Sequence, residues 1–269
     1  MTGQKASQLD PKNVQAYGNR GLAYLEKGDT DHAIADYNHA IELNPKFVKA
    51  YVIRGGASSM KGDYDRAIAD YNQALRLDPK HVSAYINRGS AYDQKGDYDR
   101  AIADYNQAIQ LDPKWVNAYI GRGSAYYGKG DTDRAVAEYI RAIQIDPKNV
   151  QAYVDRGVAY SKIGDKDRAI ADYNHAIQLD PTYAMAYMVR GSAYDQKGDY
   201  DRAIADCTRA INLDPGYAMA YYNRGLAYSK KGDHDRAIAD YNQAIKLDPL
   251  LNARPTPSPS TGPSRHQAR

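Results

Sequence analysis

Apolar and polar positions along the chain form two short helical patterns that alternate from residue 14 to residue 251. Within the 34-residue segments, apolar or aromatic residues and glycine occupy positions 1, 4, 8 and 11 of the first pattern, except for Ser58 at position 11 of the second segment. In the second pattern, apolar residues occupy positions 20, 21, 24, 27, 28 and 30. Spacings of three and four residues place side chains on one face of an α-helix, whereas a strand would alternate. The chain is therefore predicted to consist of helix pairs.

The period of the pattern is constant. The dipeptide Ala-Tyr recurs every 34 residues, with its tyrosine at Tyr17, Tyr51, Tyr85, Tyr119, Tyr153, Tyr187 and Tyr221. Seven segments follow one another without insertion or deletion, namely 14–47, 48–81, 82–115, 116–149, 150–183, 184–217 and 218–251. A fixed period of this length predicts a stack of equivalent units, each of which buries its apolar faces against its neighbours.

The residues between the patterns are those that end and begin helices. Glycine at position 15 is expected to end the first helix of each unit, and aspartate at position 16 to cap the second helix. Each unit closes with Asp-Pro, or with Asn44-Pro45 in the first repeat. We expect this acid or amide to cap the next helix, with proline as that helix's first residue.

The repeat resembles the tetratricopeptide repeat (TPR) family. Tyrosine occupies position 4, glycine position 8, alanine positions 20 and 27, and proline position 32 in all seven segments, and tyrosine occupies positions 11 and 24 in six. The resemblance implies an all-α, right-handed α-solenoid of antiparallel helix pairs. It further implies a non-enzymatic scaffold that binds a protein or peptide segment in a concave groove.

The two ends differ from the repeats. Residues 1–13 resemble the close of a second helix and are predicted to be the remnant of a partial repeat. Residues 252–269 are rich in proline and serine, which predicts a disordered tail. The last repeat would then lack a cap, so self-association through this C-terminal repeat is an expected possibility, and a larger parent protein is another.

Composition narrows the class of function. The net charge of +3 equals the contribution of three arginines in residues 252–269, so residues 1–251 carry no excess positive charge for nucleic acid. The longest apolar run, 183–189, is too short to cross a membrane. A single cysteine excludes an internal disulfide, and we expect a cytoplasmic protein.

No catalytic group of residues is recognisable. The six histidines have no metal-ligand spacing, and the glycines form no phosphate-binding loop. Cys207 replaces a core tyrosine at position 24, so burial is favoured over a nucleophile or sensor role. We therefore predict no enzyme activity, no bound metal and no cofactor.

One departure from the TPR signature is systematic. Position 7, usually leucine in the family, is arginine in every segment, and position 23 is an acid in every segment. Both positions lie beside the buried stripe, where an unpaired charge would be costly. We expect one Arg–carboxylate pair in each repeat; the alternative is a row of arginines that binds phosphate or an acidic ligand.

The candidate binding surface is the face of the first helices that does not meet the second helices. In proteins that this chain resembles, positions 2, 5, 9, 12 and 13 line the groove. The candidate residues are Val52, Ile86, Asn87, Ser90, Asp93, Asn117, Ile120, Ser124, Tyr127, Val154, Met185, Met188, Ser192, Asp195, Met219 and Tyr222. The alternative for positions 2 and 5 is simple packing against the next first helix. The lysine and asparagine set with which some TPR proteins clamp a terminal carboxylate is incomplete and is not predicted.

The sequence also fits two other classes of function. The chain could be a self-assembling structural solenoid, which would form concentration-dependent oligomers without a groove ligand. It could also be the partner-recruiting fragment of a larger protein.

The Arg–carboxylate pairing has a direct test. Replacing Arg122 alone should lower the free energy of unfolding more than replacing Arg122 and Glu138 together, because the single change strands a carboxylate. Urea unfolding followed by circular dichroism measures both losses. Equal or additive losses would contradict the pairing.

Overall fold

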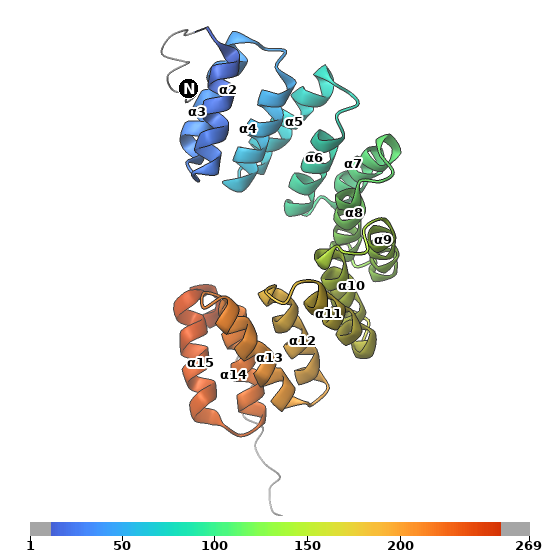
Figure 1. The fold of residues 1–269 in the computed structure, drawn as a ribbon, viewed down its shortest axis with the longest axis vertical. Helices are drawn as coiled ribbons and strands as arrows, with labels where there is room; N and C mark the ends of the chain where they lie inside the picture. The colour runs from blue at the N-terminus through green and yellow to red at the C-terminus, as the bar shows by residue number, and fades with distance from the viewer. Residues whose placement is uncertain (1–11, 254–269) are drawn as a thin grey trace, which may run out of the picture. The chain divides into compact units, whose positions relative to one another are not determined.

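Helices follow one another in pairs along the chain, as Figure 1 shows for a computed structural model that describes residues 12–253. The chain divides into two units, Met1–Pro147 and Lys148–Arg269. The first unit contains α2 (Val14–Glu26), α3 (Thr30–Leu43), α4 (Val48–Met60), α5 (Tyr64–Leu77), α6 (Val82–Gln94), α7 (Tyr98–Leu111), α8 (Val116–Gly128) and α9 (Thr132–Ile145). The second contains α10 (Val150–Lys162), α11 (Lys166–Leu179), α12 (Ala184–Gln196), α13 (Tyr200–Leu213), α14 (Ala218–Lys230), α15 (His234–Leu247) and the 3-10 helix η1 (Pro249–Ala253). The expected all-α solenoid is confirmed.

The Gly-Asp dipeptide turns the chain within each pair, as predicted. Gly28 has φ +77°, and the next N–H, that of Asp29, donates to the Tyr24 carbonyl at 2.8 Å. This bond closes the end of α2, and glycine is suited to it because the left-handed region strains other residues. The Asp29 side chain then accepts from the backbone N–H of His32 and caps α3. The other six glycines at position 15 also have positive φ.

The prediction for the Asp-Pro dipeptide was wrong. Asp78 is the C-cap residue of α5, and its carboxylate accepts from the backbone N–H of Lys80 at 3.0 Å. The dipeptide therefore forms a turn through an aspartate side chain, a conformation that competes with helix. The next helix, α6, begins three residues after Pro79, with His81 as its cap.

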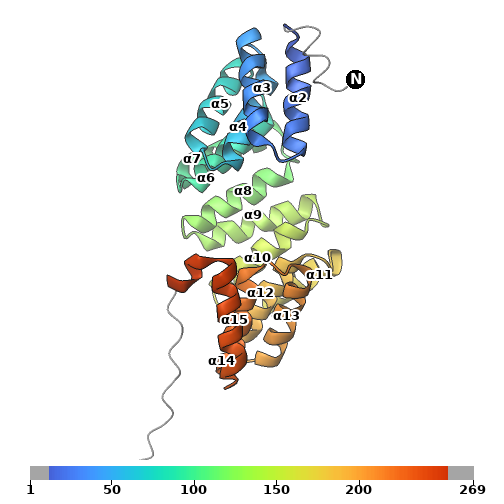
Figure 2. The ribbon, with the colours of Figure 1, turned by 90° about the vertical axis from the view of Figure 1, so that its left-hand side faces the viewer.

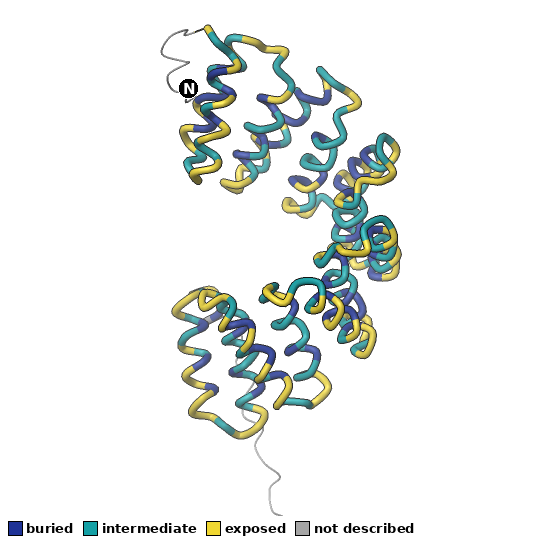
Figure 3. Tube along the Cα trace, viewed as in Figure 1, coloured by how far each residue is buried: buried dark blue, intermediate teal, exposed yellow. Residues whose placement is uncertain are grey.

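The core of six of the seven pairs is a tyrosine ring packed against a glycine; in the α12–α13 pair Cys207 takes the place of the tyrosine. Tyr71 on α5 is 1% exposed, and a Cβ added to Gly55 on α4 would lie 2.7 Å from its ring. The small residues of the signature thus allow the two helices to approach closely. Figure 3 shows how burial is distributed along each unit, with buried residues inside the helix pairs and exposed residues at the turns.

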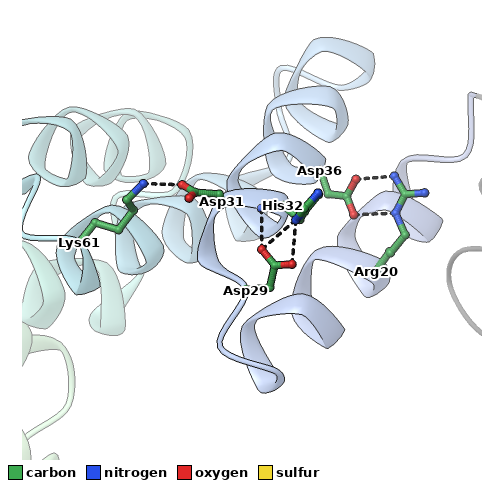
Figure 4. Close-up of polar contacts among 6 residues, drawn as sticks. All are labelled: Arg20, Asp29, Asp31, His32, Asp36 and Lys61. Atoms are coloured by element: carbon green, nitrogen blue, oxygen red, sulfur yellow. Dashed lines mark hydrogen bonds and ion pairs between the residues drawn. The ribbon is translucent and has the colours of Figure 1, made fainter.

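The expected Arg–carboxylate pair is present in all seven repeats. In Figure 4, Arg20 on α2 binds both carboxylate oxygens of Asp36 on α3, at 2.7 Å and 2.5 Å. The other pairs are Arg54–Asp70, Arg88–Asp104, Arg122–Glu138, Arg156–Asp172, Arg190–Asp206 and Arg224–Asp240. These arginines therefore link the two helices of a repeat, as structural pairing predicts.

Repeat four forms a less complete pair than its neighbours. Only the Nη2 atom of Arg122 donates to Glu138, and its buried Nε has no hydrogen-bond partner. The longer glutamate side chain replaces the aspartate that accepts two hydrogen bonds elsewhere.

Two further side-chain links, which were not predicted from the sequence, join consecutive repeats. Arg88 donates through Nη1 to Asn72 of the preceding repeat at 2.6 Å. Lysine at position 14 forms an ion pair with aspartate at position 18 of the preceding repeat, as Lys61 and Asp31 do in Figure 4. The recurrence of lysine at position 14 and of asparagine at position 25 was the available signal.

The first helices form the more closely spaced layer within each unit. In the first unit α4 contacts α6 and α6 contacts α8, and in the second α10 contacts α12 and α12 contacts α14. Among the described elements, no pair of second helices makes comparable contact. Figure 2 shows successive pairs of one unit side by side. Each unit therefore curves toward its first helices.

Two adjacent glycines of α4 test the packing. A Cβ added to Gly56 would lie 3.9 Å from its nearest neighbour, the Tyr71 hydroxyl oxygen. A Cβ added to Gly55 would lie only 2.7 Å from the Tyr71 ring. Gly56→Ala should stabilise the helix by about 0.5–1 kcal/mol. Gly55→Ala should be less stable than Gly56→Ala by about 1–3 kcal/mol. Urea unfolding of both variants measures the difference, and equal stabilities would contradict the tight ring contact.

Candidate functional site: the inner face of each unit

All candidate residues lie on first helices. In the first unit, α4 carries Val52, α6 carries Ile86, Asn87, Ser90 and Asp93, and α8 carries Asn117, Ile120, Ser124 and Tyr127. In the second unit, α10 carries Val154, α12 carries Met185, Met188, Ser192 and Asp195, and α14 carries Met219 and Tyr222. We define the first-helix surface of each unit as its inner face.

Several apolar candidates at position 5 pack between repeats. Val154 is 0% exposed and packs with Ala176 and Ala186. Val52 packs against the buried residues around Tyr51, and Met188 packs against those around Ile211. For these residues the structure agrees with the packing alternative. Met185, which is 39% exposed, is an apolar candidate that reaches the surface.

The inner face of the first unit contains a half-buried carboxylate. The Ser124 hydroxyl on α8 donates to Asp93 on α6, with an Oγ to Oδ2 distance of 3.2 Å. Burial raises the pKa of Asp93, and the hydrogen bond from Ser124 opposes that shift in part. Ser90, one turn earlier on α6, is exposed. This part of the face offers a carboxylate and hydroxyl groups.

The inner face of the second unit repeats this segment with a different neighbour. Residues 190–206 have the same sequence as residues 88–104. Asp195 corresponds to Asp93, but its partner is the Lys230 ammonium on α14, at 2.6 Å. Leu226 stands where Ser124 stands in the first unit, so no hydroxyl is offered at that position. The same segment thus presents an ion pair in the second unit and a carboxylate that accepts from a hydroxyl in the first unit.

Asp155 on α10 belongs to the same surface and was not among the sequence candidates. The Tyr183 hydroxyl donates to Gln151 Oε1 at 2.6 Å, and Gln151 Nε2 donates to Asp155 Oδ1 at 2.7 Å. Burial raises the pKa of Asp155 to about 6, against the effect of the Gln151 hydrogen bond. An acid at position 6, where every other repeat has an uncharged residue, was the signal.

The remaining candidate chemistry is structural. Cys207 is fully buried on α13, and burial raises the pKa of its thiol to about 12, which disfavours the reactive thiolate. Within residues 12–253, no three histidine, cysteine or acidic side chains are grouped to hold a metal ion. In the same range, every helix lacks the length and apolar content of a membrane-spanning segment.

Comparison with protein families identifies the repeat. Models described as tetratricopeptide repeat or TPR repeat match residues 14–47, 61–114, 123–164, 150–183, 172–205, 191–232 and 218–249. The chain belongs to the tetratricopeptide repeat family. A comparison with curated protein sequences gives no significant match.

Solved structures of other repeat proteins are similar. The MamA protein is 31% identical, with a TM-score of 0.52 over 64% of this chain and 93% of MamA. A tetratricopeptide repeat protein from Parabacteroides merdae is 22% identical, with a TM-score of 0.72 over 87% of this chain and 93% of that one. YrrB, described as a TPR protein with an unusual peptide-binding site, is 24% identical, with a TM-score of 0.50 over 66% of this chain and 92% of YrrB.

Asp155 makes the stability of the protein depend on pH. Its raised pKa means that the native state binds the proton more tightly than the unfolded state does between about pH 4 and 6, so stability falls as pH rises through that range. Asp155→Asn keeps an acceptor for Gln151 and removes the charge.

The variant should be more stable than wild type at pH 7.5, by up to about 3 kcal/mol, since one pKa unit corresponds to about 1.4 kcal/mol. At pH 3.5 the two should be nearly equal. Urea unfolding at both pH values measures this, and Asp93→Asn serves as the comparison for a more weakly shifted carboxyl. A difference that does not change with pH would refute the assignment.

Proposed function

We propose that the protein is a non-enzymatic scaffold that binds a segment of a partner protein along the inner face of a unit. The observation that carries this proposal is the half-buried Asp93 with its Ser124 donor on the inner face of the first unit. Among residues 12–253, the hydrogen-bond partner of the Asp93 carboxylate is the Ser124 hydroxyl, and no basic side chain forms an ion pair with it. Such a carboxylate can accept hydrogen bonds from the backbone or from a basic side chain of a bound segment.

The pattern of variation supports the same surface. Positions 3, 4, 7, 8 and 10 are invariant or nearly so among the repeats because they pack or pair, whereas positions 2, 6, 9, 12 and 13 differ from repeat to repeat. Residues at these variable positions can change to suit a ligand without disturbing the contacts that hold the fold. YrrB, which shares the fold, is described as having a peptide-binding site, which agrees with this proposal.

The two units are proposed to differ in preference. Lys230 neutralises Asp195 on the second unit, and the apolar Leu226 stands where Ser124 stands in the first unit. The inner face of the first unit is the more acidic of the two around position 12. The proposed ligand of the first unit is therefore a segment with a basic residue, and nucleic acid is not proposed because residues 1–251 have no excess positive charge.

Peptides selected from a random display library against the whole protein provide the test. Asp93→Lys should raise the dissociation constant of peptides selected by the first unit about tenfold or more, equivalent to about 1.4 kcal/mol. Asp195→Lys and the exposed α7 substitution Gln110→Lys are the matched controls, and both should leave this constant within about twofold. Fluorescence anisotropy with labelled peptides measures the constants.

Circular dichroism melting confirms that each variant is folded. Selected peptides that bind the three variants equally well, or a library that yields no binder, would argue against the proposed site.

A further inference from the structure

The joint between consecutive repeats of a unit has a fixed composition. A lysine at position 14 pairs with an aspartate at position 18 of the preceding repeat in Lys61–Asp31, Lys95–Asp65, Lys129–Asp99, Lys197–Asp167 and Lys231–Asp201. An alanine at position 10 packs into the same joint. Ala91, for example, packs with Ile68 and Tyr71 of the preceding repeat. Charge and apolar contact are thus combined in one recurring interface.

Helix α15 carries one half of this joint. Asp235 at position 18 is exposed, and within residues 12–253 it forms no ion pair. Ile238 at position 21 is 57% exposed, whereas its counterpart Ile34, which is followed by another repeat, is 9% exposed. The short helix η1 contacts α15 and buries Leu251, yet it leaves Ile238 exposed.

Helix α2 carries the complementary half. Ala23 at position 10 is exposed, whereas Ala57, Ala91 and Ala125 are at most 2% exposed. Lys27 at position 14 is also exposed, and it forms no ion pair with any residue of the described range. Lys27 and Ala23 are therefore the groups that complete the recurring joint when they face Asp235 and Ile238 of α15.

We propose that a second copy of the chain docks its α2 against α15, head to tail, and so rebuilds the joint that repeats within each unit. Lys27 of one copy pairs with Asp235 of the other, and Ala23 covers Ile238. The two surfaces of this interface are different, so each added copy exposes a new α15 and the assembly extends along one direction. This interaction is independent of the proposed ligand site, because Asp93 and Ser124 lie on neither helix.

Two arginine substitutions block one half-joint each. Ala23→Arg places a large charged side chain where the joint requires a small residue, and Ile238→Arg does the same on α15. Both residues are exposed, so neither change should disturb the fold, which circular dichroism melting checks. Gln110→Arg, at an exposed position on α7, is the matched control.

Sedimentation velocity over a concentration series measures the outcome. Wild type and Gln110→Arg should show masses that rise with concentration beyond twice the 29.9 kDa of one chain. Each blocked variant alone should remain at 29.9 kDa, since every copy then lacks the same half-joint. An equimolar mixture of the two variants should form a one-to-one complex and nothing larger, because one intact α2 meets one intact α15.

Three results would overturn the proposal. The first is a wild-type protein that stays monomeric at about 1 mM, a concentration that would reveal an interaction of about −4 kcal/mol. The second is association of Ala23→Arg but not of Ile238→Arg, which indicates a two-fold contact between copies of α15. The third is association of both variants alone, which places the interface elsewhere.

Discussion

The guanidinium at repeat position 7 is the group on which the rest of each unit depends. In the third repeat, Arg88 binds both oxygens of the buried Asp104 and donates to Asn72 of the preceding repeat. Its guanidinium carbon also lies 5.6 Å from the ring centroid of Tyr85. A buried carboxylate without this partner would lose its hydration without compensation. One side chain therefore holds two helices of a repeat together and orients them against the repeat before it.

This arrangement separates positions that maintain the fold from positions that can vary. Arginine, its carboxylate, the tyrosine of position 24 and the glycine that receives its ring use the surfaces between helices. The inner face is left to residues such as Ser90 and Asp93, which the packing does not require. Identical segments consequently acquire different chemistry from their neighbours: Asp93 accepts a hydrogen bond from the Ser124 hydroxyl, whereas Asp195 forms an ion pair with Lys230.

Repetition also has a consequence at the ends of the stack. A joint that recurs between consecutive repeats leaves one half on α2 and the other half on α15, with opposite charges, Lys27 and Asp235, at complementary positions. The exposed Ile238 and the exposed Ala23 show the apolar part of the same complementarity. Ligand binding on the inner face and association through the ends would use separate surfaces, so that one protein could carry out both.

The amino-acid sequence by itself determined the helix pairs, their period, the glycine turns and the Arg–carboxylate pairs, because each of these depends on residues at fixed spacing within one repeat. The prediction that Asp78 caps the next helix was wrong. Its carboxylate forms a side-chain turn at the end of α5, a conformation that competes with capping. Only the tertiary structure decided which inner-face residues are accessible. Val154 is fully buried and Met188 partly buried against adjacent repeats, and the pKa of Asp155 rises because neighbouring helices remove water from its carboxylate. Such burial depends on contacts between repeats, and the spacing within one repeat does not encode them.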